Sequence, residues 1–242
     1  MKRGTSSALT LSLGVAAVAA LVATYAYGLA LPETVEQAHY SKLIAIHPGV
    51  AWASYVAFGV LALASALWLW PRTRSLTWDL LAGASAEVGV VFTTLTLVTG
   101  SIWGRPTWGV WWVWDARLTL SALMLAINLG YLALRRVPAD AEVRGRRSAV
   151  AGLLAVVVVP INHFAVEWWQ TLHQDRSLAQ VTPGDDLDGQ FIFAMVLGFL
   201  AMTLVYAWLT VHRVRVARLE EDVVGDDLDA ALEARRQEAV MS

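Results

Sequence analysis

Six long apolar runs constrain the fold of this chain more than any other feature of its sequence. A helix needs about 20 mostly apolar residues to cross the hydrocarbon core of a bilayer, and each run has about that length or more. The chain is 57% hydrophobic and only 16% charged, whereas soluble domains are about 25% charged. The sequence therefore predicts an all-α integral membrane protein with six transmembrane helices, at about residues 8–31, 43–70, 76–102, 116–134, 149–169 and 190–211.

The first apolar run follows the basic residues Lys2 and Arg3 and could belong to a signal peptide. The apolar region of a cleaved signal peptide has about 7–15 residues, which is shorter than this run, so we expect a retained span. Residues 1–219 are predicted to form one membrane domain. The largely acidic residues 220–242 are predicted to form a solvated, partly helical cytoplasmic tail, to which the sequence assigns no role.

Lysine and arginine are unevenly distributed between the two sides of the predicted bundle. Loops rich in these residues stay in the cytoplasm, and all but four of the 18 fall on the side that holds both termini. Both termini are therefore predicted to be cytoplasmic, which agrees with an even number of spans. The arginine clusters need no nucleic-acid partner to explain them. The four exceptions, on the predicted outer side, are Lys42, Arg105, Arg117 and Arg176.

A tryptophan-rich segment, residues 103–115, joins the third and fourth spans on the predicted outer side. Its sequence is WGRPTWGVWWVWD. Tryptophan is common at both membrane interfaces, so an aromatic belt is one interpretation. The close spacing favours another, a platform of rigid rings that binds a flat apolar ligand. The segment contains five of the chain's 12 tryptophans, namely Trp103, Trp108, Trp111, Trp112 and Trp114.

The spacing within this segment predicts how such a platform is formed. If the residues after Pro106 are helical, positions i, i+3, i+4 and i+7 share one face of the helix. Those positions hold Trp108, Trp111, Trp112 and Asp115. The predicted face is aromatic and ends in one carboxylate.

Two of the five histidines lie at predicted span boundaries on the same outer side. His47 precedes Pro48, which places it at a helix start, because proline suits the first helical turn and disfavours helix in the residue before it. His173 follows the fifth span. Among flat apolar ligands, metal-bearing macrocycles such as haem take imidazole ligands at the metal. The two histidines are therefore candidate ligands beside the tryptophans, although an ordinary surface role for each stays open.

Ionisable residues inside the spans offer alternatives. His163 is a rival ligand, but in a helix it lies ~15 Å deeper than His173, so the two cannot both reach one interfacial iron. We expect His163 to bond a neighbouring helix or the haem periphery, with Glu167 one turn away to orient it. Glu87 is expected to be protonated and hydrogen-bonded to Asn128, which lies at similar depth; a proton path is the alternative.

Any haem in this chain must be held non-covalently, because the chain has no cysteine. The two haem propionates need cations or hydrogen-bond donors. Arg105 and Arg117 flank the tryptophan segment on either side and are the candidates for that role.

Three stretches of the sequence resemble the CcmC-type haem-handling proteins of cytochrome c maturation, which carry a tryptophan-rich WWD segment. The resemblance covers about residues 10–210. The stretches are LVTGSIWGRPTWGVWWVWDARLT at 97–119, IHPG at 46–49, and PINHFAVEWWQTLHQ at 160–174.

This resemblance implies a multi-pass protein of the bacterial inner membrane that is not an enzyme. It implies haem b bound on the periplasmic side, with axial ligands His47 and His173 and residues 103–115 as the platform at the haem edge. The implied partners are a periplasmic haem chaperone of the CcmE type, ABC transporter subunits of the CcmA and CcmB types, a small single-span CcmD-type protein and membrane lipid.

Two other functions stay open at the level of sequence. One is a haem lyase of the wider WWD group, whose members usually have more spans or further histidines. The other is a membrane-anchored b-type electron-transfer cytochrome, which would need facing histidines within the spans, where only His163 qualifies.

Overall fold

The structure is a computed structural model that describes residues 8–34, 37–173 and 186–241. Six helical stretches in this part of the chain are long and apolar enough to cross a membrane, which confirms the predicted number. The second stretch combines η1 with α2, and the fifth combines α5 with α6. The elements are α1 (Ala8–Ala30), the 3₁₀ helix η1 (His39–Ala45), α2 (His47–Leu69), α3 (Leu76–Trp108), α4 (Ala116–Arg136), α5 (Ala141–Ala155), α6 (Val158–Trp168) and α7 (Asp186–Met241).

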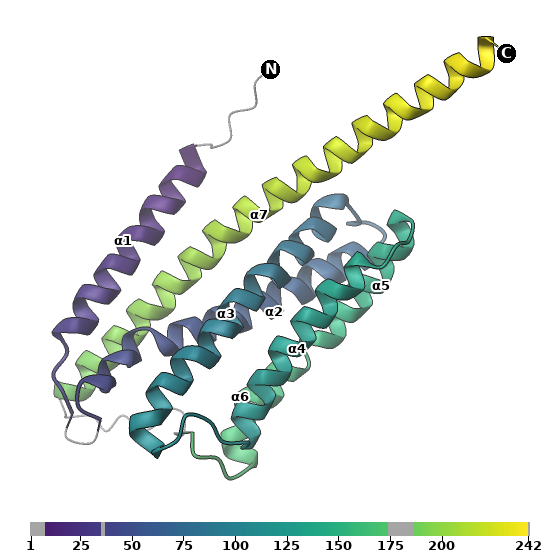
Figure 1. Cartoon of the computed structure of the whole chain (residues 1–242). Helices are drawn as coiled ribbons and strands as arrows, with labels where there is room; N and C mark the ends of the chain where they lie inside the picture. Colours follow the sequence, from purple (N-terminus) through teal and green to yellow (C-terminus); the bar gives the residue numbers. More distant parts are fainter. Residues whose placement is uncertain (1–7, 35–36, 174–185, 242) are drawn as a thin grey trace.

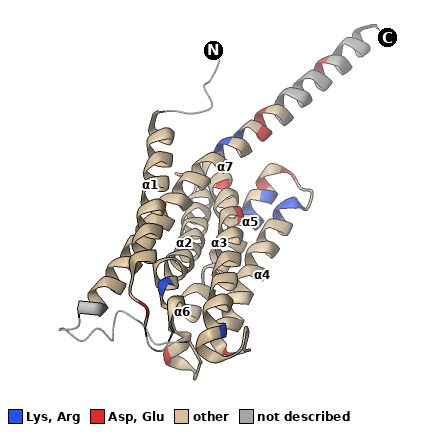
Figure 2. Cartoon of the chain, turned by 60° about the vertical axis from the view of Figure 1, so that its left-hand side comes forward, with Lys and Arg blue, Asp and Glu red and all other residues tan. Residues whose placement is uncertain are grey.

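Helices α2 and α3 form the centre of the bundle. Helix α2 packs on α3, α5 and α7, and α3 also packs on α4, while α1 lies mainly against α7. The start of α1 and the end of α7 lie at the same end of the bundle (Figure 1), as an even number of spans requires. Charged residues concentrate towards the two ends (Figure 2). That the end with the termini faces the cytoplasm stays a prediction.

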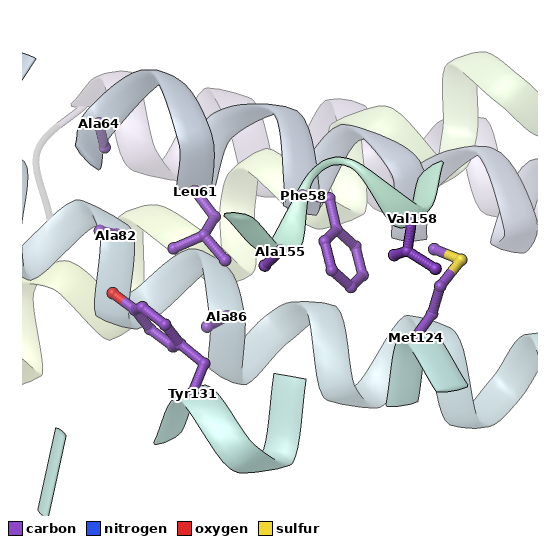
Figure 3. Packing of buried hydrophobic residues seen from close by; sticks show 9 residues of the cluster. All are labelled: Phe58, Leu61, Ala64, Ala82, Ala86, Met124, Tyr131, Ala155 and Val158. Carbon is purple, nitrogen blue, oxygen red and sulfur yellow. The ribbon is translucent and has the colours of Figure 1, made fainter. Parts of the chain in front are cut away.

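The main apolar core lies between α2, α3, α4 and α5 (Figure 3). Phe58 and Leu61 of α2 are fully buried there against Met124 of α4. Alanines line the facing turns of α3 and α5, because small side chains let helix backbones approach closely within a membrane. The core therefore holds α4 and α5 against the central pair of helices.

The fifth span is broken into two helices by Pro160. Proline has no N–H to donate to the carbonyl four residues earlier and its ring crowds that carbonyl, here Val156. The backbone changes to i→i−3 bonds at this point, with the N–H of Val159 donating to Val156 at 3.0 Å. Helix α5 ends at Ala155 and α6 begins at Val158. As a result, α5 packs on α2 and α6 packs on α4.

Two helices are longer than the sequence predicted. Helix α3 continues past residue 102 to Trp108. Helix α7 extends from Asp186 to Met241, whereas a span at 190–211 was expected. Its 56 residues correspond to ~84 Å of helix, against a hydrocarbon core of ~30 Å. The proposed domain boundary at residue 220 lies inside this helix, which passes through it without a break.

Ion pairs join distant helices within the bundle, and one of them corrects a prediction. The carboxylate of Glu87 accepts hydrogen bonds from Arg213 of α7, so the expected bond to Asn128 was wrong. Arg213 was missed because it lies 126 residues away in sequence. Asn128 is instead buried, and its amide atoms find no partner in the described part of the chain. Arg135 donates to both oxygens of Asp79 at 2.7 and 2.9 Å.

Candidate functional site

The tryptophan segment is divided by a helix end at Gly109. Helix α3 includes Trp103 and Trp108, and Gly109 closes it in the left-handed conformation, with φ +77°. Residues 110–115 have no helical structure before Asp115 begins α4. The predicted helical face of three tryptophans and Asp115 is therefore wrong. A glycine in the left-handed region is a common helix terminator, and this signal was available in the sequence.

Close packing orders the last turn of α3. The ring of Trp108 lies directly over Gly104, where an added Cβ would approach ring carbons to 2.8 Å. The guanidinium of Arg105 donates to the carbonyl of Gly109 and so ties the helix end to the chain that follows. Arg105 is exposed and engaged in this local bond, and within the described part of the chain its guanidinium makes no other hydrogen bond.

His47 is the first residue of α2, as predicted from Pro48. Its Nδ1 lies 2.9 Å from the hydroxyl oxygen of Thr99. That hydroxyl donates its single proton to the carbonyl of Leu95 at 2.7 Å, so the Nδ1–H of His47 must be the donor to Thr99. The other nitrogen, Nε2, then carries a free lone pair, the form in which a neutral imidazole binds a metal. The ring meets Trp103 edge to face at 5.7 Å between centroids.

His173 lies in residues 169–173, which follow α6 and have no helical structure, and it is near Trp108 in the last turn of α3. Its ring centroid is 6.3 Å from that of Trp108. The carboxylate of Asp115 accepts from the N–H of Leu172 at 3.1 Å, next to His173. His47 and His173 therefore each lie beside one of two tryptophans that are five residues apart near the end of α3. The two histidines are 126 positions apart in the chain.

A hollow of about 900 Å³ lies beside His173. This volume falls within the ~300–1,000 Å³ typical of small-molecule and cofactor sites. His47 is not among its lining residues, so the hollow is bounded by one histidine only. Its walls are Val113, Trp114, Asp115 and the eight residues 166–173.

The remaining tryptophans of the segment differ in exposure. Trp111 and Trp114 are 59% and 79% exposed, which is high for such large apolar rings. Trp112 packs edge to face on Trp114 at 5.4 Å. Its indole N–H is buried and has no acceptor among the residues that the structure describes. A buried donor without an acceptor is costly, so this N–H is suited to an acceptor supplied by a ligand.

The guanidinium of Arg117 is anchored by backbone carbonyls of α6. Its Nη1 donates to the backbone carbonyls of Asn162 and His163 at 3.2 and 3.1 Å. The side-chain amide of Asn162 donates in turn to the backbone carbonyl of Arg117 at 3.2 Å and to the hydroxyl of Ser121 at 2.9 Å. The hydroxyl of Tyr55 donates to the Oδ1 of Asn162 at 2.7 Å. Helices α2, α4 and α6 are joined at this point.

The ring of His163 contacts one aromatic residue of α2 and one of its own helix. Its ring meets Tyr55 edge to face at 6.1 Å and Phe164 at 5.0 Å. Glu167 lines the hollow. The expected orientation of His163 by Glu167 stays a prediction.

Sequence reasoning missed several residues that shape this site. Thr99, Tyr55, Ser121 and Asn162 had no role in the sequence analysis. Ser121 could have been found, because it stands four residues after Arg117 and so shares its helix face. The other three act across helices far apart in sequence, and no local pattern marks them.

The chain is similar to proteins of one family over most of its length. The family model for heme exporter protein C matches residues 2–227. Heme exporter protein C of Haemophilus influenzae is 35% identical over 81% of this chain and 79% of its own. That of Bradyrhizobium diazoefficiens is 37% identical over 83% of this chain and 75% of its own, and that of Paracoccus denitrificans is 31% identical over 89% and 91%.

Proposed function

Because this chain belongs to the heme exporter protein C family, we propose that it holds one haem at the outer membrane surface and delivers it to a periplasmic haem chaperone. Membership of the family supports a role in haem handling for cytochrome c maturation. The single observation that carries the finer proposal is that His47 and His173 each lie beside a tryptophan from the last two turns of α3.

His47 and His173 are the proposed axial ligands of the haem iron. The bond from Nδ1 of His47 to Thr99 leaves Nε2 free and orients the ring, as second-shell partners of metal ligands do. His173 belongs to a short non-helical segment held at Leu172 by Asp115. One ligand therefore stands on a helix and the other on a tethered segment, so the second can be withdrawn without unfolding the bundle.

Aromatic residues 103–115 are the proposed platform for the macrocycle. Trp103 and Trp108 lie beside the two imidazoles, and the exposed Trp111 and Trp114 offer further apolar surface to a large flat ring. Buried porphyrin surface adds hydrophobic stabilisation without covalent attachment. The platform thus suits a cargo that must be released again.

The propionates of the cargo are proposed to meet Arg117 and the indole N–H of Trp112. Arg117 uses Nη1 for α6, and no other hydrogen bond of its guanidinium is recorded in the described part of the chain. The remaining N–H groups can donate to a carboxylate in a bidentate manner. Arg105 is the weaker candidate, because it is exposed and bonded to Gly109.

The proposed reaction is a transfer rather than bond making by this chain. Ligand exchange at iron lets the chaperone take the haem as His173 withdraws. We propose the bacterial inner membrane as the location, with the site on the periplasmic side. The proposed partners are a CcmE-type chaperone, CcmA- and CcmB-type ABC transporter subunits and a CcmD-type single-span protein.

The visible spectrum of the purified protein loaded with haem tests this proposal. We expect a bis-imidazole spectrum that is lost when His47 and His173 are both changed to Ala. A double variant with an unaltered spectrum would refute the ligand assignment. His163→Ala is the control, because His163 contacts Tyr55 outside the proposed iron site; loss of the spectrum in that variant would favour a cytochrome with haem embedded between the helices.

A further inference from the structure

We propose that Asn162 is a positioning residue that aims Arg117 at the haem propionates. The inference rests on the proposed function and adds to it a residue that touches neither haem nor iron. The observation behind it is a reciprocal set of bonds. The side chain of Asn162 holds the backbone of Arg117, and the backbone of Asn162 holds the side chain of Arg117.

Every hydrogen-bonding group of the Asn162 side chain is used. Its two N–H groups donate to the Arg117 carbonyl and to Ser121, and its oxygen accepts from Tyr55. The side chain is 1% exposed, so water does not compete for these bonds. An amide with all these bonds made in a low-dielectric interior has one orientation, since rotation would leave buried polar groups unpaired.

These bonds determine which N–H groups of the Arg117 guanidinium are left to bond a ligand. Nη1 is committed to two carbonyls at the middle of α6, at 3.1 and 3.2 Å. A guanidinium is planar with five N–H donors in a rigid fork, so anchoring one nitrogen fixes the direction of the rest. Arg117 is not itself among the residues that line the hollow, but it lies two residues after Asp115, which does. The proposal assigns the remaining edge of the fork to a carboxylate of the bound haem.

A second buried asparagine, Asn128, serves to distinguish a positioning role of Asn162 from a purely structural one. Asn128 is also 1% exposed. It lies about three turns after Arg117 in α4 and packs against Gly89 of α3. Its amide atoms have no partner in the described part of the chain. Asn128 thus offers a control of equal burial and equal volume without any link to Arg117.

The test compares binding of haem with binding of haem dimethyl ester, in which both propionates are esterified. We expect the wild-type protein to bind haem about tenfold or more tightly than the ester, because a charge-assisted pair is lost in the ester. Arg117→Leu should abolish this preference. Asn162→Leu should lower it about as far while keeping the bis-imidazole spectrum, and Asn128→Leu should leave it unchanged.

Milder variants cover the case in which Asn162→Leu fails to fold. Tyr55→Phe and Ser121→Ala each remove one bond to Asn162 and should each lower the preference about threefold. An unchanged preference in these variants, or in a folded Asn162→Leu, overturns the proposal. A wild-type protein that binds haem and its dimethyl ester equally well also overturns the proposal, but the proposed function stands if the bis-imidazole spectrum is present. A wild-type protein without that spectrum contradicts the proposed function itself.

Discussion

The carboxylate of Asp115 lies 3.1 Å from the backbone N–H of Leu172, and this bond joins the start of α4 to the segment that carries His173. The same carboxylate caps α4 by accepting from Leu118 at 2.8 Å. One side chain therefore serves both the stability of a helix and the placement of a proposed ligand.

Changing Asp115 to Ala should separate these two effects. Loss of the cap should cost about 0.5–2 kcal/mol, measured by thermal unfolding in detergent. Haem affinity should also fall, because the segment at Leu172 loses its tether. Asp140→Ala is the matched control, since Asp140 caps α5 through Val143 and has no second bond to the site; it should lower stability alone. Equal haem affinity in the two variants would contradict the tether.

Changing Thr99 to Val should weaken the His47 ligand. The substitution removes the acceptor of Nδ1–H, and second-shell losses of this kind reduce metal affinity about 10–100-fold. Thr99→Ser should retain most of the affinity. Thr96→Val serves as the control, because the hydroxyl of Thr96 donates to Phe92 in the same helix and no contact with a histidine is recorded. Haem titration followed by absorption measures the effect, and equal affinities for the two valine variants would refute the tautomer assignment.

Gly109→Ala should destabilise the end of α3. A residue with a Cβ pays about 1–2 kcal/mol in the left-handed conformation that Gly109 adopts. Relief of that strain would move residues 110–115, so haem binding should weaken as well. Gly130→Ala is the contrasting variant, because Gly130 lies inside α4 with open space around it and alanine there should stabilise by about 0.5–1 kcal/mol. Thermal unfolding of both variants provides the comparison.

Breaking the Asp79–Arg135 pair should be much more damaging than breaking an exposed pair. The two side chains are 7% and 16% exposed and bonded at both oxygens, so Asp79→Ala should cost about 3–5 kcal/mol by leaving a buried charge unpaired. The pair of Arg74 with Glu142 is 35% and 65% exposed, and Glu142→Ala should cost at most about 1 kcal/mol. Similar unfolding temperatures for the two variants would contradict this ranking.

Local sequence patterns predicted the spans and the helix start at His47 because both depend on neighbouring residues. Six apolar runs are each long enough to cross a bilayer, and Pro48 restricts the residue before it. The error at residues 103–115 arose from extending helical spacing past Gly109, whose left-handed conformation ends α3.

Local sequence patterns do not predict contacts between segments that are distant in the chain. Glu87 appeared to lack a basic neighbour, yet Arg213 reaches it from the last helix. The placement of His47 and His173 beside the end of α3 likewise depends on how α2, α3 and the residues after α6 pack together, which no spacing rule describes. Their assignment as ligands came from the family resemblance and stays a proposal.

The bend at Pro160 divides one span between two tasks. Its half on the side of the chain termini, α5, packs on α2 in the buried core, whereas its other half, α6, packs on α4 and carries Asn162 and part of the wall of the hollow. One membrane span thus packs into the core with its first helix and lines the hollow with its second. Substitutions in α6 can therefore alter the fit of the bound ligand while the packing of α5 on α2 stays unchanged.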